Sequence, residues 1–153
     1  MFHIVLFEPE IPPNTGNIIR LCAKSGASLH LIHPLAFELD DKRLRRAGLD
    51  YHEYSDVRHY DNLESFLKSV NPTHLFACTT KATQNYTEVQ FTPGDALLFG
   101  PETRGLPSSV LHRLKPEQQL RIPMRENSRS LTLSNAASII LYEAWRQNGF
   151  VTA

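Results

Sequence analysis

The chain has 153 residues, a length that fits one domain with a sizeable buried core. Hydrophobic residues make up 41% of it and charged residues 21%, which is ordinary for a globular protein and excludes a disordered chain. No apolar run reaches the roughly 20 residues that span a membrane, and the first residues do not resemble a secretory signal. A cytoplasmic protein that does not enter the membrane is therefore expected.

The charges balance, with 16 Lys and Arg against 16 Asp and Glu, so no overall field attracts a polyanion. A nucleic-acid site must then come from local clustering. One such cluster exists, formed by Lys42, Arg43, Arg45 and Arg46. Asp40 and Asp41 precede it as helix-start signals, and a run of this kind is by itself most often a solvated helix face.

The predicted elements alternate from the first residues onward. Residues 3–7 form a short β-rich run, and residues 14–25 show a helical repeat in which Asn14 can cap the start and Gly26 closes the end. A second strand is predicted at residues 29–32.

The second half of the chain continues the alternation. Asp61 can cap a helix, and Pro72 stops it before a strand at residues 75–78. Four further elements follow: a strand at residues 96–99, a short helix at 108–114, a strand at 119–122 and a long amphipathic helix from 133 to near 149. This βαβα pattern predicts an α/β fold, a mostly parallel sheet with helices on both faces, in a single domain over residues 1–153. Ligands of such sheets bind beyond the carboxyl ends of the strands.

Common catalytic signatures are absent from the sequence. It contains no phosphate-binding loop, dinucleotide-binding turn, nucleophile elbow or paired-histidine zinc motif, so no metal is expected. Cys22 and Cys78 lie in apolar surroundings without metal-ligand spacing, which predicts reduced, buried thiols.

Three polar segments, the first two of which contain glycine, instead follow or connect predicted strands, at residues 14–20, 99–106 and 122–135. Each has an ordinary interpretation when taken alone: a helix start with a cap at Asn14, a Gly-Pro turn, and a serine-rich start of the last helix. Gly16 in the first segment also lets a ligand approach the backbone.

Taken together, in this order and spacing, the three segments resemble the motifs of the SPOUT class of RNA methyltransferases. Residues 8–12, 41–52 and 142–147 also resemble the small bacterial members of that class that methylate the wobble ribose of tRNA, so the resemblance covers essentially the whole chain. It implies a deep trefoil knot over about residues 75–150, a topology that periodicity cannot predict. It also implies a homodimer with its active site at the subunit interface.

The activity that the resemblance implies is transfer of a methyl group from S-adenosylmethionine to the 2′-hydroxyl of tRNA nucleotide 34, a cytidine or carboxymethylaminomethyluridine. Arg20 would activate the hydroxyl, with Asn14 and Ser130 around it. The implied cofactor contacts are Cys78, Thr79, Gly100, Glu102, Ile122, Met124, Ser130 and Leu131. The implied tRNA contacts are Lys42, Arg43, Arg46, His52, Arg129 and Tyr142.

One residue departs from the pattern, because Thr132 stands where relatives commonly carry asparagine. A threonine offers one hydroxyl in place of the donor and acceptor pair of an amide. This difference favours a rival interpretation, in which the protein is a catalytically silent scaffold that binds RNA or cofactor. A ribosomal RNA 2′-O-methyltransferase of the same class and a metabolite-binding module unrelated to RNA are two further rival interpretations.

Overall fold

The computed structural model describes residues 1–152. Its centre is a six-stranded sheet in the order β3-β2-β1-β5-β4-β6, in which every neighbouring pair is parallel. The strands are β1 (His3–Phe7), β2 (Ser28–Ile32), β3 (Arg58–Tyr60), β4 (Leu75–Cys78), β5 (Ala96–Phe99) and β6 (Gln119–Leu120). The predicted α/β class and mostly parallel sheet are confirmed, whereas the trefoil knot stays a prediction.

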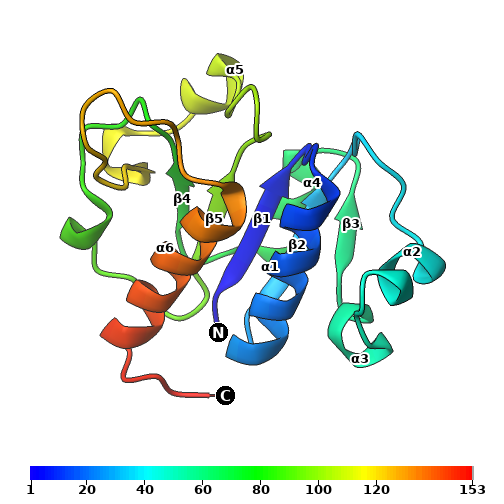
Figure 1. Ribbon diagram of the computed structural model, residues 1–153. Helices are drawn as coiled ribbons and strands as arrows, with labels where there is room; N and C mark the ends of the chain where they lie inside the picture. The colour runs from blue at the N-terminus through cyan, green and yellow to red at the C-terminus, as the bar shows by residue number, and fades with distance from the viewer. Residues whose placement is uncertain (153) are drawn as a thin grey trace.

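Helices cover both faces of the sheet. The helices are α1 (Pro12–Ser25), α2 (Asp41–Arg46), α3 (Tyr51–Tyr54), α4 (Leu63–Val70), α5 (Ser108–Leu111) and α6 (Leu133–Gln147), with short 3-10 helices η1 (Tyr86–Glu88) and η2 (Pro116–Gln118). The long helices α1 and α6 lie side by side on one face, and α4 and α5 pack on the other (Figure 1). No helix within residues 1–152 is long and apolar enough to cross a membrane.

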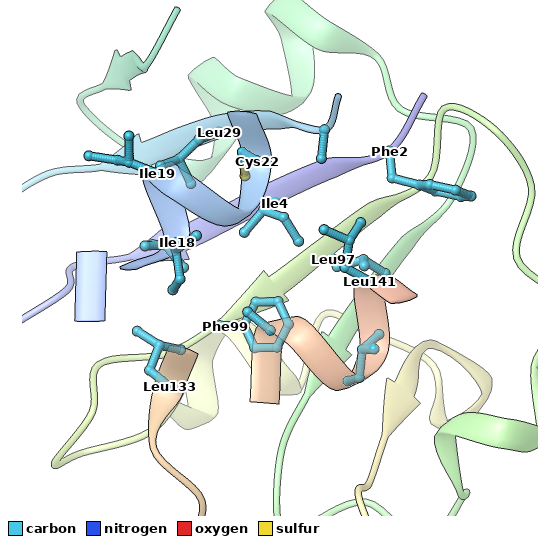
Figure 2. Packing of buried hydrophobic residues seen from close by; sticks show 14 of the residues in the cluster. Phe2, Ile4, Ile18, Ile19, Cys22, Leu29, Leu97, Phe99, Leu133 and Leu141 are labelled. Carbon is cyan, nitrogen blue, oxygen red and sulfur yellow. The ribbon is translucent and has the colours of Figure 1, made fainter. Parts of the chain in front are cut away.

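The core follows from the alternation of side chains along each strand. Ile4 on β1 and Leu97 on β5 pack toward α1 and α6, whereas Val5 and Leu98 pack toward α4 and α5. Figure 2 shows the first of these clusters, where side chains of α1, β1, β2, β5 and α6 converge. Because both faces are covered, the central strands β1, β4 and β5 are almost continuously apolar.

Several predicted boundaries were wrong. Helix α1 begins at Pro12 and its cap position is Ile11, so Asn14 lies in the first turn instead of capping it. Two prolines occupy that turn, where a missing N–H costs nothing and the fixed φ suits a helix. Asn62, not Asp61, caps α4 by accepting a hydrogen bond from the Ser65 N–H.

The other differences concern short elements. The predicted strand at residues 119–122 is a strand only over Gln119–Leu120, followed by an isolated bridge between Arg121 and Asn85. The helix predicted at 108–114 ends at Leu111. Strand β3 and helix α3 were not predicted, because three- and four-residue elements carry almost no periodic signal.

Candidate functional site

A cavity of about 450 Å³ opens where β4 and β5 end. Cys78 ends β4 and Phe99 ends β5, and the loops that follow both strands form its walls together with the segment before α6. The eight predicted cofactor contacts all line it: Cys78, Thr79, Gly100, Glu102, Ile122, Met124, Ser130 and Leu131. The structure thus gathers three segments that are far apart in the sequence at the edge where a parallel sheet binds ligands.

The loop after β5 folds tightly against itself beside the cavity. A Cβ atom on Gly100 would lie 2.6 Å from the Gly105 carbonyl carbon and still closer to the Leu106 nitrogen. Gly105 has a φ of 68°, and its N–H donates to the Pro101 carbonyl over 2.8 Å. Two glycines therefore give this wall its shape, one by close approach of backbone and one by a left-handed conformation.

Two carboxylates hold this loop against the segment before α1. The Glu102 carboxylate accepts from the Glu10 N–H over 2.8 Å and from the Ile11 N–H over 2.7 Å. In return, the Glu10 carboxylate accepts from the Thr103 N–H over 2.8 Å and from its hydroxyl over 2.7 Å. Hydrogen bonds from Thr103, followed by those from Arg104, lower the pKa of Glu10, which keeps the carboxylate charged. We call this reciprocal pair the Glu10–Glu102 clasp.

Asn14 connects helix α1 with this cavity. Its Nδ2 lies 3.4 Å from a Glu102 oxygen, and its Oδ1 accepts from the Ser134 hydroxyl over 3.5 Å at the start of α6. Thr132, at the cap position of α6, also lines the cavity, but its side chain caps no backbone group of that helix. Asn14 and Ser130 are thus brought to one cavity, as predicted for residues of one site.

The chemistry of the lining suits a ligand with both apolar and polar parts. Phe99, Leu106 and Leu133 are buried apolar side chains, whereas Ser130 and Thr132 offer hydroxyl groups and Glu102 a carboxylate. Burial raises the pKa of Cys78 to about 12, so its thiol stays protonated and packs as an apolar group. Within residues 1–152 there is no group of three or more His, Cys, Asp or Glu positioned to hold a metal ion.

Arg20, the predicted activating residue, does not line this cavity. It lies further along α1 and lines a second cavity, of about 430 Å³, between α1 and the segment that contains α2. Its Nη2 donates to the Ala47 carbonyl over 2.9 Å. Within this chain, the structure therefore does not bring Arg20 together with Ser130 in one cavity.

The predicted tRNA contacts are exposed and fall in two regions. Lys42, Arg43 and Arg46 lie on α2, which the buried Leu44 anchors, and His52 lies on α3. Arg43 is already paired, because its guanidinium donates to Asp40 over 2.7 Å and to Glu38. Arg129 precedes α6, and on α6 itself Tyr142 remains 41% exposed while its ring packs edge-on against Trp145.

Several residues of the cavity were not predicted as site residues. Lys81, Thr103 and Leu106 line it, and Glu10 holds its wall in the clasp. Thr103 and Leu106 lie in a segment that the sequence did single out, so their position was a usable signal. Glu10 lies in residues 8–12, which the sequence also singled out, but nothing local indicated its contact with Thr103, which is 93 residues away in sequence.

The chain was then compared with known proteins. Residues 1–142 match the model of the SpoU rRNA Methylase family. A protein of Aeromonas hydrophila named tRNA (cytidine(34)-2'-O)-methyltransferase is 60% identical over 98% of this chain and 96% of its own length. The Escherichia coli K12 protein of the same name is 59% identical over the same shares. The chain belongs to the SpoU methylase family.

Solved structures agree with this assignment. One described as "Structural insights into the 2-OH methylation of C/U34 on tRNA" is 43% identical, has a TM-score of 0.87 and covers 97% of both chains. The SpoU methyltransferase AviRb from Streptomyces viridochromogenes, in complex with the cofactor AdoMet, is 26% identical with a TM-score of 0.80. That match covers 95% of this chain and 57% of the other.

Proposed function

We propose that this protein transfers a methyl group from S-adenosylmethionine to the ribose 2′-hydroxyl of nucleotide 34 in tRNA. The observation that carries the proposal is the cavity beyond β4 and β5, which gathers the eight residues expected to contact the cofactor. The tRNA substrate and the position of the nucleotide are proposed because relatives that match nearly the whole chain share the name tRNA (cytidine(34)-2'-O)-methyltransferase.

S-adenosylmethionine fits the residues of this cavity and supplies, when bound, an electrophilic methyl group on a sulfonium. Leu106 and Leu133 offer apolar surface for a flat ring, whereas Ser130, Thr132 and Glu102 offer hydrogen-bonding groups. The close backbone approach at Gly100 shapes this wall and admits no side chain there.

Arg20 supplies the positive charge that the acceptor oxygen needs as it loses its proton. A guanidinium with a pKa above about 12 is a poor base, so Arg20 stabilises the developing negative charge through its N–H groups. A phosphate of the substrate or a water molecule then takes the proton. We expect Arg20→Lys to lose most of the turnover while its affinity for the cofactor is unchanged, because lysine cannot reproduce the planar donor geometry.

We further propose a homodimer with the active site at the subunit interface. Arg20 and Ser130 line separate cavities of one chain, and a second copy allows the Arg20 of one protomer to act at the cofactor cavity of the other. Tyr142, an exposed aromatic side chain on α6, offers surface for that contact.

Mixed dimers test this arrangement. Arg20→Ala and Leu131→Arg, the second of which blocks the cofactor cavity, are co-expressed with different tags and purified as the heterodimer. A shared site leaves one complete active site, so the heterodimer should recover about half of the wild-type turnover per dimer. An inactive heterodimer would place the whole site within one chain.

The activity itself is tested with methyl-labelled S-adenosylmethionine and total bacterial tRNA, followed by mapping of the labelled nucleotide. Label at the ribose of nucleotide 34, lost in Arg20→Ala, is the expected result. Isolated ribosomal RNA serves as the competing acceptor, and label there instead would overturn the proposal. Cofactor binding without label on any RNA would identify a silent scaffold.

A further inference from the structure

The second cavity, of about 430 Å³, shares no lining residue with the cavity assigned to the cofactor. It lies between α1 and the segment that runs from β2 through α2. Its volume falls within the range of small-molecule sites, roughly 300–1,000 Å³. Two features of its lining, a glycine and an arginine, indicate that a ligand occupies it.

Gly16 lies inside α1 without a need for glycine in the fold. Its φ is not positive, and an added Cβ would meet only Leu49 Cδ1, at an ordinary contact distance of 4.0 Å. Glycine weakens a helix interior relative to alanine, and here backbone and packing both permit the more stable residue. The missing side chain leaves room on the floor of the cavity, which a bound molecule can use.

Arg20 brings a positive charge to the same cavity. Within residues 1–152 its guanidinium donates one hydrogen bond, to the Ala47 carbonyl, and forms no ion pair. A guanidinium has five N–H donors, so most of them remain available to oxygen atoms of a ligand.

The Glu38–Arg43 ion pair lines part of the remaining wall, and the apolar side chains of the rest suit a flat ring. Phe37 and Leu39 are half-buried, and Leu49, which lines the same cavity, is buried. Single-stranded RNA bases are recognised by stacking on such aromatic and apolar side chains. Asn17 stands exposed at the rim, and its amide offers both a donor and an acceptor, which matches the base edge of either cytosine or uracil.

We infer that this second cavity holds the acceptor pyrimidine nucleoside, with its base against Phe37 and Leu39 and its ribose toward Arg20. The inference rests on the proposed function and adds the place where the substrate nucleotide is bound. It also gives a reason for the separation of Arg20 from Ser130: acceptor and cofactor have separate cavities, and they meet only when the active site is assembled.

The first test fills the cavity with Gly16→Leu. We expect the KM for an anticodon stem-loop to rise at least about tenfold, the effect of losing one stacked base, with the cofactor Kd within about twofold of wild type. Ala23→Leu adds the same group to α1 outside the cavity and should leave both constants unchanged. Sedimentation velocity accompanies the assay, and a dissociated Gly16→Leu dimer would make Gly16 an interface residue and overturn the inference.

The second test locates the base directly. A stem-loop with 4-thiouridine at the acceptor position is irradiated with the wild-type protein, and the crosslinked tryptic peptide is identified by mass spectrometry. We expect the peptide of residues 25–42, which contains Phe37. Methylation of tRNA with a crosslink elsewhere and an unchanged KM in Gly16→Leu would overturn this inference alone, whereas no methylation by the wild type would overturn the proposed function.

Discussion

Single residues set both the shape of the cofactor cavity and the stability of the sheet. Gly100 is the clearest case, because the backbone of Gly105 and Leu106 occupies the space that a side chain would need. We expect Gly100→Ala to lower the free energy of unfolding by about 1–3 kcal/mol through overpacking and to weaken cofactor binding at the same time. Thermal unfolding and calorimetric titration with S-adenosylmethionine measure the two effects.

Gly105→Asn is the matched control for that substitution. Asparagine tolerates the left-handed conformation, and no atom lies within 4 Å of a Cβ at this position. Its stability should therefore stay close to that of the wild type. Equal losses in the two variants would show that the loop tolerates no substitution at all, and close approach at Gly100 would not be the reason.

His30 is the buried titratable residue that makes the stability of the fold depend on pH. It lies between His3, 2.9 Å away, and the Tyr60 hydroxyl, 3.0 Å away, and its ring packs edge-on against Phe66. Burial, then the charges of His3 and Arg58, lower its pKa from 6.5 to about 3. The neutral ring is therefore the form that the folded protein accommodates.

The sign of the pH effect follows from this shift. Between pH 6.5 and about 3, His30 is protonated in the unfolded chain but neutral in the folded protein. The contribution of His30 to the free energy of unfolding is therefore full above pH 6.5 and decreases as the pH falls toward about 3. Chemical denaturation at a series of pH values should show a shallower decline in His30→Gln than in the wild type. A residual slope is expected, because burial also lowers the pKa of His3. Parallel curves would contradict the assignment to His30.

At the scale of elements, the Glu10–Glu102 clasp joins the loop after β5 to the start of α1. Its donors are mainly backbone N–H groups, which only a correctly placed carboxylate can satisfy together. We expect Glu102→Ala to weaken cofactor binding by roughly tenfold, since it removes a hydrogen-bonding group from the cavity and leaves a loop that must be ordered when the ligand binds.

Glu102→Gln provides a graded comparison, because an amide retains one acceptor oxygen. Its affinity should lie between those of wild type and Glu102→Ala. Glu117→Ala removes an exposed carboxylate outside the cavity and is expected to change nothing. If Glu102→Ala bound the cofactor normally, the loop would be rigid without the clasp.

At the scale of the whole molecule, a protein with no net charge must bind a polyanion through local patches. Arg43 is engaged with Glu38 and Asp40, whereas Lys42 and Arg46 form no ion pair within residues 1–152. We expect Lys42→Ala with Arg46→Ala to weaken tRNA binding and to lower the slope of log K against log salt by about 0.7–0.9 per lost phosphate contact. Arg43→Ala should have a smaller effect.

Filter binding at several salt concentrations measures these slopes. Lys68→Ala, which removes an exposed cation from α4 on the other side of the sheet, should leave the slope unchanged. An unchanged slope in the Lys42 and Arg46 variant would show that α2 is a solvated surface helix that does not contact tRNA.

The sequence by itself determined the class of the fold and part of the lining of the cavity beyond β4 and β5. Strands buried on both faces are continuous apolar runs, whereas apolar residues in a surface helix recur about every 3.6 residues. The alternation of strands and helices could therefore be recognised in the sequence. Motif resemblance predicted eight residues as cofactor contacts, and all eight line one cavity because parallel strands end at one edge of the sheet.

Only the tertiary structure decided the contacts between distant segments. The Glu10–Glu102 clasp spans more than 90 residues, and the burial of His30 depends on neighbours from β1, β3 and α4. The separation of Arg20 from Ser130 into two cavities had no local signal either. Local sequence fixes the direction of a side chain on its own element, whereas its surroundings depend on how all the elements pack together, which is a property of the whole chain.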